Sequence, residues 1–150
     1  MDYHYLGRKR KHLCKYLSYQ KPDGNSLRLP LLKIEIQHEE KRMSTVALLD
    51  SGATATFLPH DIAFGILNLP IEKDDVEVVG AGSTFPNFLT KVEKITLKKG
   101  VNGICELRDV MIHVPKPPAG IPYAVLGRDT IFSLFDITFR EREGKFLLKR

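Results

Sequence analysis

The amino-acid sequence predicts an all-β fold: a closed, mostly antiparallel β-barrel with two short helices. Short apolar or alternating segments recur from residue 31 onwards, and turn-forming residues separate them. Only two stretches, 59–67 and 128–134, have the character of helices. The sequence shows no internal repeat and no low-complexity tract. Many short strands with few helices are typical of one barrel-like domain.

Each strand is expected from its own side-chain pattern. In the first, Leu32, Ile34 and Ile36 alternate with polar residues, as in a strand with one buried face. The first helix is expected to begin at Pro59, because proline suits the first position of a helix. The expected strands cover residues 31–37, 43–49, 54–58, 76–79, 88–97, 104–114, 124–126, 135–140 and 145–149.

Turn-forming residues connect these strands. A polar cluster at 38–42 and the Asn-Gly dipeptide at 102–103 each predict a hairpin turn. The stretch Gly80-Ala81-Gly82 predicts another hairpin tip, because glycine allows left-handed backbone. A phosphate-binding loop competes as an interpretation of these glycines, but no helix is expected after them and Pro86 follows closely.

Length and composition narrow the class of protein. A chain of 150 residues with 43% hydrophobic residues is expected to form one globular domain. It contains no apolar run of the roughly 18 residues that a membrane span needs, and no signal peptide. Its two cysteines cannot form a disulfide framework. We therefore expect a cytoplasmic protein with no membrane partner.

The net charge of +5 belongs to one end of the chain. Residues 1–30 contain seven Lys and Arg residues and two Asp residues, whereas residues 31–150 contain sixteen of each sign. The sequence thus predicts a basic N-terminal extension at 1–30 and a folded domain at 31–150. Because the charge excess lies outside the expected barrel, the folded domain shows no charge bias towards nucleic acid, and nucleic acid is not expected as a partner.

The candidate catalytic residues lie in one stretch, Val46-Ala47-Leu48-Leu49-Asp50-Ser51-Gly52-Ala53-Thr54. Its apolar half predicts a buried strand that ends at Asp50. A carboxylate in that position is costly unless it is hydrogen-bonded or used in chemistry. Ser51 adds a small hydroxyl, and Gly52 lets the backbone turn and approach closely. These residues together predict an acid that backbone amides hold at a cleft.

The same stretch resembles the active-site loop of aspartic proteases. A second motif, Ala124-Val125-Leu126-Gly127-Arg128-Asp129, follows about seventy residues later and resembles the retroviral-type, or retropepsin-like, branch. The resemblance covers roughly residues 31–148. It implies a β-rich acid-protease fold and hydrolysis of peptide bonds in a polypeptide substrate.

The resemblance assigns roles to the loop residues. Asp50 would be the catalytic acid and base, and Ser51 would hydrogen-bond across a dimer axis. Gly52 would offer its carbonyl to the substrate backbone, and Ala53 would pack beneath the loop. Thr54 stands close to where viral enzymes commonly carry an acid, so the substrate-backbone contact made by that acid is not expected here.

The resemblance also assigns roles outside the loop. Gly80, Ala81 and Gly82 would form the tip of a flap that closes over bound peptide. Gly127 would support the active-site loop, where two backbones touch. Arg128 would make structural contacts near a dimer interface, and the chain ends would build a sheet between subunits.

Carboxylate-driven peptide hydrolysis needs two acids that share a proton and a water molecule. The sequence contains one Asp-[Ser/Thr]-Gly triplet, at Asp50. The enzyme is therefore expected to be a homodimer with Asp50 of each subunit at its axis, and a monomer would be inactive. No cofactor is expected, and the scattered histidines show no metal-binding spacing.

Two other functions remain open. The first is a dimeric module of the same fold that binds peptides without cleaving them. The second is a small barrel that binds nucleic acid through its basic extension. Loss of peptide cleavage on substitution of Asp50 would favour the enzyme over the peptide-binding module. Steep salt dependence of DNA or RNA binding would favour the nucleic-acid-binding barrel.

Overall fold

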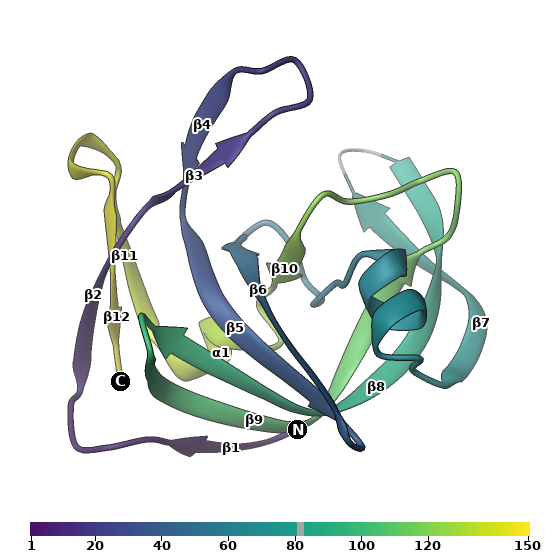
Figure 1. Ribbon diagram of the computed structural model, residues 1–150, viewed down its shortest axis with the longest axis horizontal. Coiled ribbons are helices and arrows are strands. Elements are labelled where there is room, and N and C mark those ends of the chain that lie inside the picture. The colour runs from purple at the N-terminus through teal and green to yellow at the C-terminus, as the bar shows by residue number, and fades with distance from the viewer. Residues whose placement is uncertain (81–82) are drawn as a thin grey trace.

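The computed structural model describes residues 1–80 and 83–150, and most of them lie in β-strands (Figure 1). The predicted mostly antiparallel β architecture with two short helices is confirmed. The largest sheet has seven strands. These strands are β1 (Asp2–Tyr5), β5 (Leu31–His38), β6 (Lys41–Leu49), β7 (Ile71–Gly80), β8 (Ser83–Lys99), β9 (Asn102–Pro115) and β10 (Ala124–Leu126).

The seven-stranded sheet is open. Its order is β1-β9-β8-β5-β6-β10, with β7 paired to β8, and only the β10–β6 pair is parallel. The predicted closure into a barrel is wrong, because within residues 1–80 and 83–150 no sheet closes on itself. The physical reason is the pairing at the chain ends. The C-terminal strands pair with an N-terminal strand in a separate sheet and so do not close the large one.

That separate sheet has the order β11-β12-β2 and contains β2 (Lys11–Lys15), β11 (Asp136–Arg140) and β12 (Lys145–Lys149). A third, two-stranded sheet is the hairpin of β3 (Leu17–Gln20) and β4 (Ser26–Leu29). Residues 1–30 thus contribute strands to all three sheets. Whether they form a segment distinct from 31–150 stays a prediction.

In residues 1–80 and 83–150 the two short helices are η1 (Asp61–Ile66) and α1 (Ile131–Leu134), and a single 3-10 turn, η2 (Glu141–Glu143), lies between β11 and β12. Helix η1 follows Pro59, as predicted, and closes with a π-type hydrogen bond from the Leu67 amide to the Ile62 carbonyl, 2.9 Å. Helix α1 is shorter than predicted, because Thr130 has non-helical backbone angles.

Two local predictions are wrong. Residues 102–103 do not form the turn of the β8–β9 hairpin: Lys99 pairs with Asn102, and the turn is at 100–101. Gly100 supplies the required left-handed backbone, with φ +60°. The strand expected at 54–58 is reduced to two isolated bridges of Phe57, with His113 and Val125. Its neighbours instead make the turn after β6.

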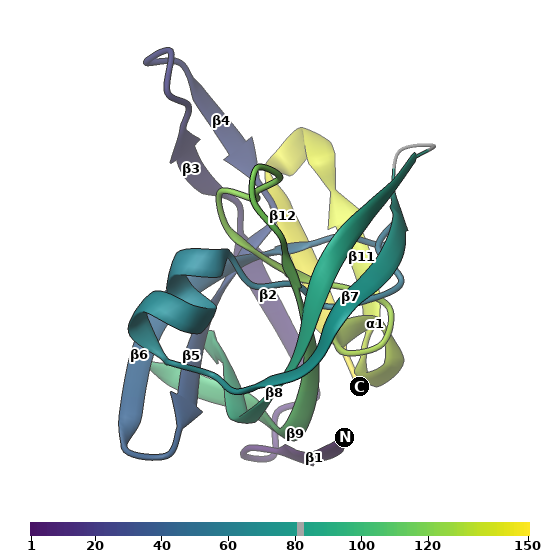
Figure 2. The same cartoon turned by 90° about the vertical axis from the view of Figure 1, so that its right-hand side faces the viewer.

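The core lies between the large sheet and the β11-β12-β2 sheet. Alternate residues of β5, including Ile34 and Ile36, are fully buried, as the sequence pattern predicts. Phe146 of β12 and Leu107 of β9 are completely buried in the same cluster. The β3–β4 and β7–β8 hairpins project from one side of the molecule in both views (Figures 1 and 2).

Candidate functional site

Strand β6 places Asp50 at the edge of the core. The strand runs beside β10 with Leu49 opposite Leu126, and the Asp50 amide donates a hydrogen bond to the Leu126 carbonyl, 3.2 Å. Ala47 and Leu49 are buried, whereas Asp50 is half-buried. The carboxylate therefore stands where the packed strand meets the solvent.

The backbone after Asp50 turns tightly around its carboxylate. The Ala53 amide donates to the Asp50 carbonyl, 3.1 Å, and the Gly52 amide donates to the Asp50 Oδ1, 2.9 Å. A Cβ at Gly52 would lie 3.2 Å from that oxygen, so a larger residue would crowd it. A carboxylate held by a backbone amide has a defined orientation before any ligand arrives.

Asp50 lines a cleft of about 300 Å³. Among the described residues that line this cleft, Asp50 alone is charged. The remaining lining is mostly apolar and comes from the loop after β6, the β7–β8 hairpin and the segment around β10. The lining residues are Asp50, Gly52, Ala53, Thr54, Phe57, Val78, Val79, Phe85, Ile121 and Val125. One carboxylate in an apolar cleft is a typical setting for acid–base chemistry on a bound ligand.

The backbone of Gly127 lies directly behind the Asp50 loop. A Cβ at this position would be 2.1 Å from the Ala55 carbonyl oxygen and 2.8 Å from that of Ala53. Distances this short leave room only for hydrogen, so the two backbones can touch only at a glycine. The Arg128 amide then donates to the Ala53 carbonyl, 2.8 Å, and ties the two segments together.

A hydroxyl network continues behind Gly127. The Thr56 hydroxyl donates to the Asp129 Oδ1, 2.8 Å, and lies 2.8 Å from the Thr130 hydroxyl. It also accepts a hydrogen bond from the Gly127 amide, 3.3 Å. Desolvation raises the pKa of Asp129, and the hydrogen bond from Thr56 partly opposes this rise.

His113 lies on the other side of Thr56. Its amide donates to the Thr56 carbonyl, 2.9 Å, and its ring packs on Phe57 with centroids 5.7 Å apart. Burial lowers the pKa of His113, and the charge of Asp129 partly opposes this shift. Its Nδ1 atom is buried without a hydrogen-bond partner in the described part of the chain.

The β3–β4 hairpin reaches the same region through an aromatic pair. Tyr19 of β3 meets Tyr123 edge to face, with ring centroids 5.2 Å apart. Burial raises the pKa of the Tyr123 phenol, and the charges of Tyr19 and Asp50 raise it further. Tyr123 therefore links the N-terminal hairpin to the neighbourhood of Asp50.

The structure brings the two sequence motifs together. Asp50, Gly52, Ala53 and Thr54 line the cleft, and Gly127 and Arg128 contact the loop from behind. Ser51 and Arg128 are exposed, and Gly80 ends β7. The predicted flap residues Ala81 and Gly82 lie outside the described residues.

Sequence reasoning did not identify the apolar lining or the polar groups behind the loop. Phe57, Phe85 and Ile121 come from three separate segments, and only folding brings them to the cleft. Thr56 and Asp129 carried a weak signal, because Asp129 directly follows the Gly127-Arg128 pair and Thr56 lies close after the acidic loop.

No group of three or more His, Cys, Asp or Glu residues that could hold a metal ion occurs in residues 1–80 and 83–150. In the same residues, no helix is long and apolar enough to cross a membrane.

Comparison with solved structures identifies a similar fold. A retropepsin-like aspartic protease from Rickettsia conorii matches with a TM-score of 0.52 and 10% sequence identity, over 95% of this chain and 96% of that one. No family model and no curated protein sequence matches. At this identity the likeness shows the fold alone: the chain has a retropepsin-like fold.

Proposed function

We propose that this protein is a homodimeric aspartic endopeptidase. One observation carries the proposal: the Asp50 carboxylate, oriented by the Gly52 amide, stands in a mostly apolar cleft of about 300 Å³. The retropepsin-like fold and the loop sequence Asp50-Ser51-Gly52-Ala53 support the same activity.

The reaction would use Asp50 of both subunits. One carboxylate accepts a proton from water, and the water oxygen attacks the scissile carbonyl carbon. The other carboxyl group, protonated at the start, donates its proton to the carbonyl oxygen, which gives a tetrahedral diol. The C–N bond of the diol then breaks: the leaving amine takes the proton that the first carboxylate accepted, and a diol hydroxyl returns a proton to the second. Two carboxyl groups this close titrate as a coupled pair, so the acid and base roles belong to the pair and not to either residue.

A two-fold axis beside Asp50 would complete the site. Each chain supplies one suitable acid in its Asp-Ser-Gly loop, and a two-fold axis places the same patch of both subunits in contact. Ser51 is exposed beside Asp50, where its hydroxyl could reach the partner loop. Arg128 is likewise exposed and would contribute to contacts near the interface.

The substrate would be an extended polypeptide. The Gly52 carbonyl would accept a hydrogen bond from its backbone. The side chains of Val78, Val79 and Phe85 would cover it from the β7–β8 hairpin, and Gly80, Ala81 and Gly82 would form the tip of this flap. The apolar lining favours uncharged side chains next to the scissile bond.

A reducing compartment such as the cytoplasm fits the cysteines. Cys14 and Cys105 are buried free thiols. Burial raises the pKa of both, that of Cys105 to about 11. Such thiols are poor nucleophiles and need no oxidising environment.

The test is cleavage of an unfolded protein substrate from acidic to neutral pH. Wild type is compared with Asp50→Asn and with the control Asp61→Asn, which changes an exposed acid on η1. The mass of each protein in solution is recorded. We expect cleavage by dimeric wild type and by the control, and none by Asp50→Asn.

Other outcomes would overturn the proposal. Undiminished cleavage by Asp50→Asn would exclude a mechanism that uses this carboxylate. Cleavage by monomeric wild type would exclude an active site shared between two subunits. Inactive dimers that still bind peptides would favour the alternative function, a peptide-binding module without turnover.

A further inference from the structure

A second cavity, of about 360 Å³, is distinct from the Asp50 cleft and shares no lining residue with it. We call it the basic groove and define it by five lysines, Lys15, Lys33, Lys98, Lys99 and Lys145. They come from β2, β5, β8 and β12, so both larger sheets contribute. Apolar side chains, including Leu31 and Leu32, complete the lining, and no described lining residue is acidic.

The strand register sets lysines of the basic groove directly against each other. Lys15 lies opposite Lys145 in the β2–β12 pair, and Lys33 lies opposite Lys98 in the β5–β8 pair. Like charges directly opposite each other destabilise a sheet. This repulsion does not stabilise the folded chain. A bound anionic ligand would offset it by placing negative charge between the opposed lysines.

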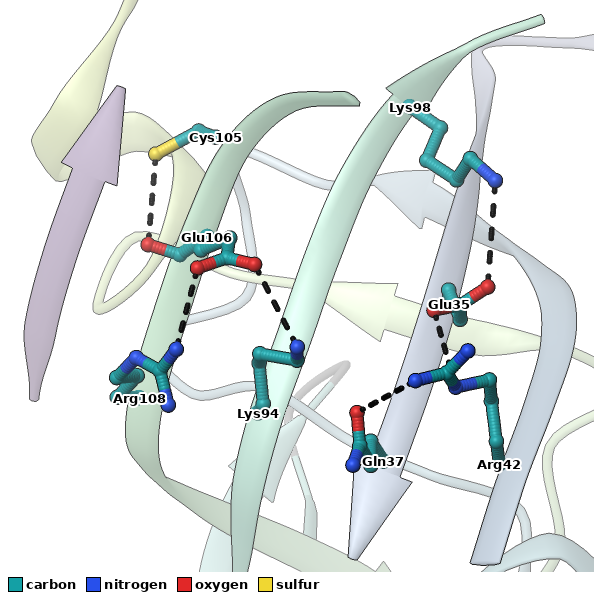
Figure 3. A network of polar contacts seen from close by, with 8 residues as sticks. All are labelled: Glu35, Gln37, Arg42, Lys94, Lys98, Cys105, Glu106 and Arg108. Carbon is teal, nitrogen blue, oxygen red and sulfur yellow. Dashed lines mark hydrogen bonds and ion pairs between the residues drawn. The ribbon is translucent and has the colours of Figure 1, made fainter. Parts of the chain in front are cut away.

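Two basic residues elsewhere on the large sheet, Lys94 and Arg108, are neutralised by the chain itself (Figure 3). Glu106 lies between Lys94 and Arg108, with contacts of 3.5 and 3.3 Å. In the basic groove, only Lys98 has such a partner: it reaches Glu35 at 4.0 Å, and Glu35 also binds Arg42. The other four lysines make no ion pair with any described residue.

The basic surface continues beyond the basic groove. A neighbouring cavity shares Lys99 and Gly100 with it and is also lined by Arg8 and Lys9. A further cavity shares Arg8 with that one and is lined by Arg10, Arg150 and Tyr5. None of the described residues around either cavity is acidic. The positive charges therefore follow a continuous path through three adjoining cavities.

Two aromatic side chains stand at the end of this path. Tyr5 lines the last cavity, and Tyr3 packs edge to face against it with 54% of its surface exposed. The pKa of a histidine beside the path reflects the positive charges that line it. The pKa of His12 is lowered by burial and also by the charges of Lys9, Lys99 and Arg150.

We propose that the basic groove and its continuation bind the phosphate backbone of single-stranded nucleic acid. A continuous series of cations, most of them without an acidic partner, suits a linear polyanion, and the exposed Tyr3 ring suits a stacked base. This interaction is independent of the proposed protease activity, because the two sites share no lining residue.

Only the tertiary structure brings these charges together. By sequence, the excess charge lies in residues 1–30, whereas residues 31–150 are balanced. Pairing of β2 with β12 brings Lys15 beside Lys145, and the β8–β9 turn brings Lys99 beside Lys9 and Arg8. The basic path thus combines charges from both parts of the chain.

The test is fluorescence anisotropy of the full chain with a labelled 20-nucleotide single strand, as DNA and as RNA, over a salt series. The groove variant carries Lys15→Glu, Lys33→Glu and Lys99→Glu. The control variant carries Lys41→Glu, Lys73→Glu and Lys91→Glu, which make the same charge change at exposed positions outside the basic groove. Thermal denaturation of each variant accompanies the binding data. Since reversal turns the two opposed lysine pairs into Glu–Lys pairs, the groove variant is expected to fold.

We expect wild type and the control variant to bind, with log K falling linearly against log salt. The groove variant should lose at least tenfold in affinity, and its salt slope should be shallower by about two, since each lost phosphate contact removes roughly 0.7. Equal losses in both variants would overturn the proposal, because net charge alone would then explain binding. So would failure of wild type to bind at low salt, or binding to vesicles rich in phosphatidylserine without binding to the oligonucleotides.

Discussion

At the scale of single residues, Gly127 is under the tightest steric constraint around the site. We predict that Gly127→Ala lowers the free energy of unfolding by about 3 kcal/mol, because the new methyl group overlaps the Ala55 carbonyl. Urea denaturation measures this change. The control is Gly65→Ala, where a Cβ meets nothing within 4 Å and helix η1 should gain about 0.5–1 kcal/mol. Similar effects of the two substitutions would contradict the close backbone contact.

Two histidines should make stability depend on pH. Burial lowers the pKa of both His12 and His113 below the ordinary value of 6.5. The unfolded chain therefore binds more protons than the folded chain as the pH falls below 6.5, and the fold loses stability. The raised pKa of Asp129 acts in the opposite sense, since it lowers stability as the pH rises from about 3.8.

We predict that the urea midpoint of wild type falls between pH 7.5 and 5.5. The double variant His12→Gln/His113→Gln should show a smaller fall, because it removes both groups that resist protonation. The variant His60→Gln, at an exposed ring, should follow wild type. Equal pH dependence in all three proteins would show that neither histidine is responsible.

At the scale of elements, the β7–β8 hairpin presents an apolar side chain to solvent beside the cleft. Val79 is 74% exposed and lines the cleft, where under the proposed function it would contact bound peptide. We predict that Val79→Ser changes the free energy of unfolding by less than about 0.5 kcal/mol. Under the proposed function it should raise KM several-fold, because it removes apolar contact with bound peptide.

Val101→Ser provides the control for the hairpin. Val101 is 88% exposed at the β8–β9 turn and lies outside the cleft. Peptide cleavage kinetics should be unchanged in this variant. If the KM of Val79→Ser is also unchanged, Val79 of the β7–β8 hairpin does not contribute to substrate binding.

The N-terminal strands show how an element can lie far from its sequence neighbours. Strand β1 pairs with β9 and strand β2 pairs with β12, so both cover sheet edges that other strands leave open. Tyr16 follows β2, is buried and donates a hydrogen bond to Glu141, 2.7 Å. Burial and this bond raise its pKa to about 12.

At the scale of the whole molecule, the proposed site requires two chains. We predict that activity per chain falls on dilution below the dissociation constant of the dimer, because a monomer holds only one Asp50. Adding an equal amount of Asp50→Asn to wild type should roughly halve the activity, since random pairing places half of the wild-type chains in mixed dimers. Sedimentation measures the dimer. Activity independent of concentration and of added mutant would contradict a site shared across an axis.

The sequence allowed much of the fold to be predicted, and the failures share one cause. The period-two pattern in β5 and the hairpin turn after it depend on neighbouring residues, and both were predicted. Closure into a barrel and the strand at 54–58 depend on which distant segments pair. The Asn-Gly turn at 102–103 failed because the β8–β9 register shifts between Leu97 and Lys98 and places the turn at Gly100.

By itself, the sequence determined the local chemistry: an acid at the end of an apolar strand, and small residues after it where the backbone must turn. It also determined which segments extend and where most of them reverse. Only the tertiary structure decided that β10 lies parallel to β6 with Gly127 against the loop, that apolar side chains from distant segments enclose Asp50, and that opposed lysines line the basic groove. The physical reason is that strand pattern is a local property, whereas register and sheet order follow from the contacts that bury the most apolar surface across the whole chain.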